Sequence, residues 1–95
     1  MAHFYRNVPK LGNVEVSRHA KTRMLEENIS SRLFEKVLLT PIEPDIPDGH
    51  DVIWRERDGV RLVILTNPIT NRKAKKKSKL IKTIYRIRPD SVARR

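Results

Sequence analysis

The chain has 95 residues, no cysteine, a net charge of +10 and a hydrophobic fraction of 38%. This size and composition suit one domain with a modest core, and they exclude a disulfide framework and thiolate chemistry. Because no apolar run approaches transmembrane length and the N-terminus lacks a signal-peptide core, we expect a cytoplasmic protein with no membrane partner.

The first part of the chain predicts an arm, a short strand and a helix. Residues 1–13 contain a proline and a glycine that break regular structure, so we expect them to form an arm. Residues 14–16 have the apolar–polar alternation of a strand. Ser17 is a suitable N-cap, and the residues after it favour a helix over 17–28.

A second helix is predicted over residues 32–39. Ser30 or Ser31 can cap its start, and Pro41 ends it because the residue before a proline avoids the helical region. Its apolar side chains follow helical spacing and form one wide face, which we expect to pack on a sheet. These side chains are Leu33, Phe34, Val37 and Leu38.

An antiparallel meander is predicted in the rest of the chain. Residues 51–57 and 60–66 have β-type patterns, and the Asp-Gly pair at 58–59 predicts a two-residue hairpin turn between them. Residues 80–87 form the last strand, and the basic segment 67–79 connects it to the preceding strand as a long loop.

The last predicted strand is interpreted as regular. If its side chains alternate strictly, Ile81 and Tyr85 lie on one face of the sheet, and Ile84 and Arg86 lie on the other. Pro89 ends the strand.

Together these elements predict an α+β fold, in which two N-terminal helices pack on one face of a small antiparallel sheet. We expect one domain over residues 1–95, with a structured body over 14–88. The basic loop at 67–79 and the arms at 1–13 and 89–95 are the expected irregular parts.

The positive charge is confined to the second part of the chain. Residues 1–58 hold nine Lys and Arg against ten Asp and Glu, a net charge of −1, whereas residues 59–95 hold twelve against Asp90 alone, a net charge of +11. A one-sided excess of this size is typical of a surface that binds nucleic acid or another polyanion, and a solvated face is the alternative.

The start of the first predicted helix resembles a known family. The His-Ala-x-x-Arg-Met motif at residues 19–24, with the turn at 26–30, is similar to the opening of a family of small uncharacterised bacterial and phage domains. That family is grouped with RelE/ParE- and BrnT-like toxins, so the resemblance, which covers about residues 14–88, implies a barnase–colicin–RelE ribonuclease-like fold. The chain departs from the family at 27–28, where Glu-Asn replaces the usual Arg-Gly, and in its longer, more basic loop at 67–79.

Candidate catalytic residues follow from what RNA cleavage without a metal requires, which is a general base and cations beside the phosphate. His19 titrates in a suitable range, and Arg23, one helical turn later, could hold the phosphate. The resemblance implies that Tyr85 and Arg86 add a hydroxyl and a cation, as C-terminal residues do in RelE-like enzymes.

Each of these residues also has a structural interpretation. His19 could hydrogen-bond to the backbone or pack on Trp54, and Tyr85 could lie at the edge of the core. Arg23 could pair with one of the two glutamates that follow it on the helix.

The cations in and around the basic loop predict a nucleic-acid contact, because such a loop gains affinity by releasing counterions without reading bases. A solubilising loop is the alternative. The candidate nucleic-acid-binding residues are Arg61, Arg72, Lys73, Lys75, Lys76, Lys77, Lys79 and Lys82. We expect no metal and no cofactor, because the sequence holds no ligand cluster and no glycine-rich phosphate loop.

Two functional hypotheses remain open. The first is a nucleic-acid-binding protein on a RelE-like scaffold, with RNA or DNA as partner; its enzymatic form is a metal-independent endoribonuclease toxin with a cognate antitoxin. The second is a non-enzymatic phage or host interaction protein that binds and inhibits a host protein through its basic surface. The net positive charge predicts a polyanionic partner, which under the first hypothesis is a nucleic acid and under the second an acidic protein surface.

Overall fold

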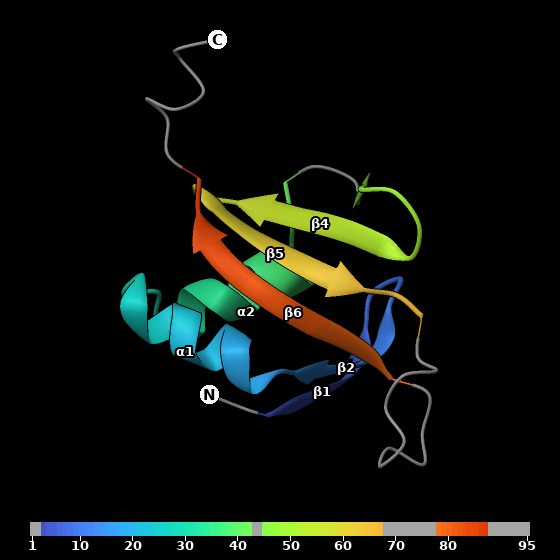
Figure 1. Cartoon of the computed structure of the whole chain (residues 1–95), viewed down its shortest axis with the longest axis horizontal. Coiled ribbons are helices and arrows are strands. Elements are labelled where there is room, and N and C mark those ends of the chain that lie inside the picture. Colours follow the sequence, from blue (N-terminus) through green and yellow to red (C-terminus); the bar gives the residue numbers. More distant parts are fainter. Residues whose placement is uncertain (1–2, 43–44, 68–77, 88–95) are drawn as a thin grey trace, which may run out of the picture.

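Two strands precede the helices, and the sheet that they join is mixed rather than antiparallel (Figure 1). The computed structural model describes residues 3–42, 45–67 and 78–87. The strands are β1 (Phe4–Val8), β2 (Gly12–Val16), β3 (Ile46–Pro47), β4 (Val52–Arg57), β5 (Val60–Leu65) and β6 (Lys79–Arg86), and the helices are α1 (Arg18–Glu26) and α2 (Ser31–Leu39). Within the described ranges the strands lie in the order β1-β2-β6-β5-β4-β3.

The segment expected to be an arm contains β1 and the start of β2. These strands pair as an antiparallel hairpin, with Phe4 opposite Glu15. The backbone is left-handed at Lys10 and Gly12, with φ of +67° and +75°. Pro9 and the residues after it therefore shape a turn between two strands instead of ending regular structure.

Strand β2 runs parallel to β6, with Val14 opposite Lys79 and Val16 opposite Ile81. A parallel pair needs a long crossover, which here contains both helices and the β4–β5 hairpin. The predicted fold class, two N-terminal helices on one face of a small antiparallel sheet, is therefore wrong. The pairing joins segments that are far apart in the sequence, so local patterns carry no signal for it.

Both predicted helices are confirmed, with capped ends. The hydroxyl of Ser17 accepts a hydrogen bond from the backbone N–H of Ala20 at 3.0 Å, and that of Ser30 accepts one from Leu33 at 3.1 Å. Asn28 follows α1 with a left-handed φ of +57°. These caps satisfy backbone groups that the helix itself leaves unpaired.

The predicted meander is confirmed in β4, β5 and β6, which pair antiparallel in sequence order. Asp58 and Gly59 have φ of +51° and +76°, as a two-residue hairpin turn requires. Because β5 is paired with a neighbour on each side, the meander gives the sheet two well-defined faces.

A bulge at Lys82 overturns the expected alternation in the last strand. Consecutive residues of β5 lie opposite Ile81 and Thr83, which leaves Lys82 without a partner in the register. Ile81 and Ile84 consequently both face the core, and Tyr85 faces away from it.

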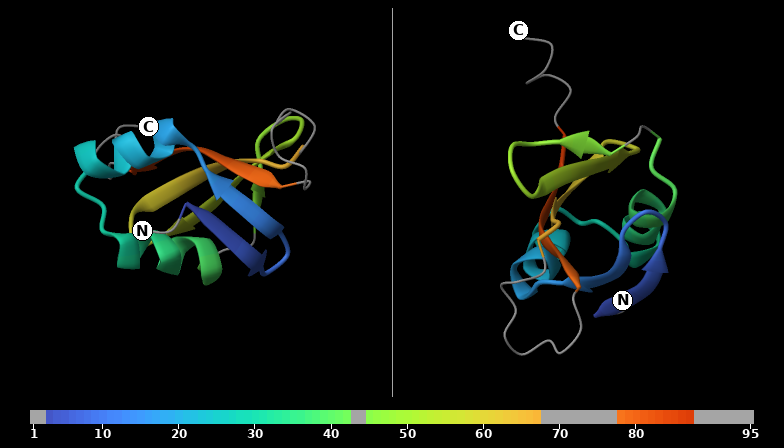
Figure 2. Two further views of the ribbon diagram at one scale, coloured as in Figure 1. Left: turned by 90° about the horizontal axis from the view of Figure 1, so that it is seen from below. Right: turned by 90° about the vertical axis from the view of Figure 1, so that its right-hand side faces the viewer.

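The core lies between α2 and the inner face of the sheet. Helix α2 contacts β4 and β5, and α1 lies along β6. Figure 2 shows that the twist of the sheet carries β1 and β2 away from the plane of β4 and β5, with α2 between the two ends. The buried apolar side chains are Val8, Leu11, Val14, Val16, Ala20, Met24, Ile29, Phe34, Val37, Leu38, Val60, Leu62, Ile64, Ile81 and Ile84.

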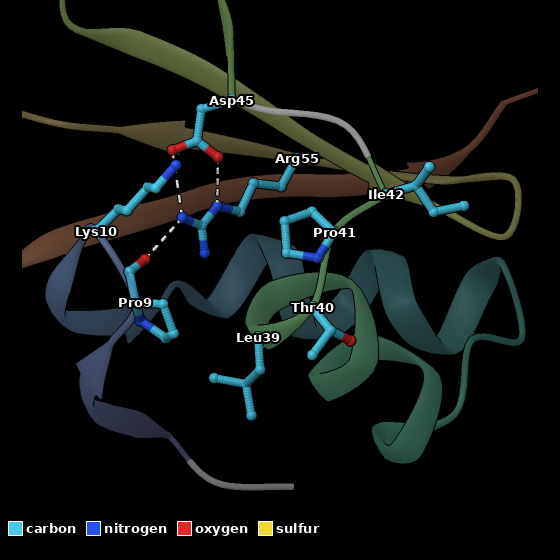
Figure 3. A pocket seen from close by; sticks show the side chains of 8 residues that line it. All are labelled: Pro9, Lys10, Leu39, Thr40, Pro41, Ile42, Asp45 and Arg55. Carbon is cyan, nitrogen blue, oxygen red and sulfur yellow. Dashed lines mark hydrogen bonds and ion pairs between the residues drawn. The ribbon is translucent and has the colours of Figure 1, made fainter.

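A buried arginine on β4 closes one end of the inner face. Arg55 is 2% exposed, and its guanidinium donates to the carboxylate of Asp45 at 2.6 Å and to the carbonyl of Pro9 at 2.7 Å (Figure 3). It also donates to the carbonyl of Leu38 at 2.5 Å. These bonds tie the β1–β2 turn, the end of α2 and the segment before β3 to the sheet.

Candidate functional site

The face of β4, β5 and β6 that is turned away from α2 carries an aromatic and cationic cluster. Arg55 and Leu62 are buried opposite each other, so the residues on either side of each point outward. In Figure 1 this face looks toward the viewer, with α2 behind the strands. We call it the outer face; its residues are Val52, Trp54, Glu56, Arg61, Val63, Leu65, Leu80, Thr83 and Tyr85.

The register arranges the outer face in rows that run across the strands. The rows are Glu56, Arg61 and Tyr85, then Trp54, Val63 and Thr83, then Val52, Leu65 and Leu80. All of these side chains are half-buried. The outer face therefore changes from a charged, aromatic end beside the Asp58–Gly59 turn to an aliphatic end at Val52, Leu65 and Leu80.

Arg61 is the centre of the charged end. Its guanidinium carbon lies 3.9 Å from the ring centroid of Trp54 and 5.6 Å from that of Tyr85. It donates to the Tyr85 hydroxyl at 2.9 Å and to the carboxylate of Glu56. Neighbouring strands of one face thus hold a planar cation over one ring and against another, an arrangement that cation–π attraction favours.

The pKa of Arg61 is raised in this setting. Partial burial works to lower it, but the hydrogen bonds to Tyr85 and Glu56 and the charges of both groups together outweigh burial. Arg61 is therefore charged at every physiological pH, and its planar donor fork is held in one orientation.

Two of the predicted catalytic residues meet at the end of α1. Arg23 pairs with Glu26 at 2.9 Å and with Glu27 at 3.3 Å. Arg86 donates from its side chain to the carbonyls of Glu27 at 2.9 Å and Asn28 at 3.0 Å, and its backbone N–H donates to the Glu27 carboxylate at 3.2 Å. Arg86 thus fastens β6 to the end of α1, whereas Arg23 pairs within α1 and its C-cap, and Glu27 is the partner that the two arginines share.

The other two predicted catalytic residues lie elsewhere. Tyr85 belongs to the outer face, and His19 is exposed on α1. Within the described part of the chain, His19 forms no hydrogen bond or ion pair with Arg23, Tyr85 or Arg86. The structure therefore brings Arg23 and Arg86 together and leaves His19 and Tyr85 outside that group.

The predicted nucleic-acid-binding residues divide into described and undescribed ones. Arg61 lies in the outer face, Lys79 is half-buried at the start of β6, and Lys82 is exposed at the bulge. The rest lie outside the described residues: Arg72, Lys73, Lys75, Lys76 and Lys77.

Sequence reasoning missed Trp54 and Glu56 as site residues. The signal was present, because Val52, Trp54 and Glu56 alternate with inward residues of the same strand. Arg55 concealed this alternation. It is a charged residue at an inward position, whereas a charge normally marks the solvent face of a strand.

Comparisons with models of protein families, with curated proteins and with solved structures found no match for this chain. The resemblance to the family grouped with RelE/ParE- and BrnT-like toxins accordingly stays a prediction. The case for function stands on the residues themselves.

A pocket of about 370 Å³ lies beside Arg55 (Figure 3). Its apolar wall includes Leu39 and Ile42, which are 39% and 60% exposed. Its two central charged groups, Arg55 and Asp45, are bonded to each other. The pocket therefore offers mainly apolar contact to a ligand.

Two features are absent from residues 3–42, 45–67 and 78–87. These ranges contain no group of three or more His, Cys, Asp or Glu side chains placed to hold a metal ion. Neither of their helices has the length and apolar character that a membrane-spanning helix needs.

Proposed function

We propose that this protein binds nucleic acid, with the outer face and the basic residues of the second half as its contact. The observation that carries the proposal is the division of charge, since residues 59–95 have a net charge of +11 and the rest of the chain has −1. Such an excess attracts a polyanion and releases its condensed counterions on binding.

The described cations differ in how freely they can meet a phosphate. Arg23, Arg55 and Arg86 are held by carboxylates or backbone carbonyls, so a phosphate would have to displace those bonds. Lys79 and Lys82 form no ion pair within the described part of the chain. These two lysines therefore offer charge to a phosphate in the same half of the chain as Arg61.

A nucleic-acid partner also fits the cytoplasmic location that the sequence predicts. Cleavage is not part of this proposal, because the four predicted catalytic residues do not form one group in the described part of the chain. The ribonuclease activity implied by the family resemblance stays a separate prediction, with its own test.

The experiment is a salt titration of binding to labelled RNA and DNA. Each neutralised phosphate adds roughly −0.9 to the slope of log affinity against log salt on duplex DNA, and roughly −0.7 on single strands. With four or five contacts, the slope should be about −3 to −3.5 on single strands and about −3.5 to −4.5 on duplex DNA. Changing Lys75, Lys76 and Lys77 to Ala should weaken binding to all sequences and flatten the slope by about 2–3 units.

A control of equal charge separates a local contact from a general effect of net charge. Changing Arg6, Arg18 and Arg32 to Ala removes the same charge from exposed positions in the first half of the chain. This control should keep the wild-type slope. Equal loss in both variants would show that net charge alone governs binding, and no binding to either nucleic acid at low salt would favour an acidic protein partner instead.

A further inference from the structure

The charged end of the outer face offers flat groups on adjacent strands. Trp54 comes from β4, Arg61 from β5 and Tyr85 from β6, and neighbouring strands lie about 4.8 Å apart. The guanidinium carbon lies over the Trp54 ring, 3.9 Å from its centroid, and 5.6 Å from the centroid of Tyr85, so the three flat groups form one cluster, which we call the platform. Bases stack on aromatic rings and on arginine planes of this kind.

The platform is already ordered before any partner arrives. Arg61 is fixed by Glu56, by the Tyr85 hydroxyl and by the ring of Trp54 3.9 Å away. An arginine in solution loses considerable side-chain freedom when it is immobilised at an interface. Here the fold has fixed it in advance, which favours binding of a flat partner group.

A stacking platform distinguishes between forms of nucleic acid. In a duplex the flat surfaces of the bases are covered by their neighbours, and only base edges and phosphates are accessible. In a single strand the bases can unstack and lie on a protein surface. Resting on the proposed function, we infer that the outer face binds single-stranded nucleic acid by stacking bases on Trp54, Arg61 and Tyr85.

The charge around the platform favours single-stranded nucleic acid over an apolar protein as the ligand of the outer face. The aliphatic row of Val52, Leu65 and Leu80 alone would suit a protein partner. However, two of the three platform residues, Arg61 and Tyr85, belong to the part of the chain with a net charge of +11, and exposed Lys82 lies on the strand that carries Tyr85. A ligand with both flat groups and regular negative charge matches these features together.

Trp54 is the only tryptophan in the chain, so its fluorescence reports this site alone. We would titrate the full chain with a short single-stranded RNA or DNA, with a duplex, and with inorganic polyphosphate of equal charge. Saturation with the single strand should quench Trp54 emission strongly, because stacking places a base against the indole or its guanidinium cover. Polyphosphate should bind without comparable quenching.

The outcomes separate this inference from the proposed function. Tight binding of the single strand without quenching, or equal quenching by polyphosphate, would overturn the stacking inference and leave nucleic-acid binding intact. Binding the duplex more tightly than the single strand would also overturn it. No binding to any nucleic acid would remove the proposed function as well.

A matched pair of variants tests the platform by a second measurement, the anisotropy of a labelled oligonucleotide. Trp54→Phe keeps a ring, and it should bind the single strand within about fivefold of wild type. Trp54→Leu keeps apolar cover without a ring, and it should bind roughly 5- to 150-fold more weakly, which corresponds to one lost stacking contact. Thermal unfolding of both variants checks the fold, and equal binding by two folded variants would contradict the inference.

Discussion

Arg55 and Arg61 lie on neighbouring strands of one sheet, and their side chains leave it on opposite faces. Arg55 is 2% exposed and is held by one carboxylate and two backbone carbonyls. Arg61 is 22% exposed and is held by one carboxylate, one hydroxyl and two aromatic rings. The same type of residue thus has two roles: Arg55 joins distant segments on the inner face, and Arg61 completes a surface on the outer face.

The two arginines differ in how far their hydrogen-bond donors are needed by the fold. The groups around Arg55 belong to three separate segments that need it to stay in place, so its donors are committed to the fold. Those around Arg61 come from strands that are already paired through their backbones. Removing Arg61 should therefore disturb a surface, whereas removing Arg55 should disturb the fold.

The largest expected effect comes from Arg55→Met. Loss of the Arg55 guanidinium leaves the Asp45 carboxylate and the carbonyls of Pro9 and Leu38 without their donor. Breaking a buried pair in this way typically costs about 3–5 kcal/mol of unfolding free energy. Urea denaturation should show this loss of unfolding free energy. A loss below about 1 kcal/mol would show that Arg55 does not hold the segments together.

Arg61→Met should have a smaller effect on stability and a larger one on binding. A partly exposed ion pair is worth about 0–1 kcal/mol and a cation–π contact about 0.5–2 kcal/mol, so we expect a loss of about 1–2 kcal/mol. Nucleic-acid affinity should fall, because both the charge and the stacking plane are gone. If Arg61→Met destabilised the chain as much as Arg55→Met, the contrast between the two faces would disappear.

His19→Ala should change stability least. His19 is exposed and forms no ion pair within the described ranges, so the change in unfolding free energy should stay within about 0.5 kcal/mol. If the family resemblance extends to chemistry, the same variant should lose RNA cleavage, since one acid–base group is worth roughly 10²–10⁴ in rate. Equal cleavage by wild type and variant, or none by either, would remove His19 as a catalytic residue.

The elements with a local chemical signal could be predicted from the sequence. The Asp58–Gly59 turn, the serine caps of both helices and the apolar face of α2 each depend on a few adjacent residues. The pairing of β2 with β6 joins Val14 to Lys79, so no local pattern encodes it. The hairpin before β2 was missed because its turn residues also suit an irregular arm.

The candidate site was only partly predictable for a related reason. Arg61 and Tyr85 were expected to matter, but strict alternation placed Tyr85 with Ile81. The bulge at Lys82 adds one residue to the strand and turns Tyr85 to the face of Arg61 and Trp54. A bulge depends on pairing with the neighbouring strand, which is a property of the folded sheet.

The central claim is that the outer face, and not the helical side, meets the nucleic acid. The most direct measurement is amide and indole chemical-shift perturbation in ¹⁵N-labelled protein on addition of a short single-stranded RNA. The account predicts the largest changes at the Trp54 indole N–H and at the amides of Arg61, Val63 and Tyr85, with small changes along α2. Perturbations concentrated on α1 and α2, with an unchanged Trp54 indole signal at saturation, would contradict it.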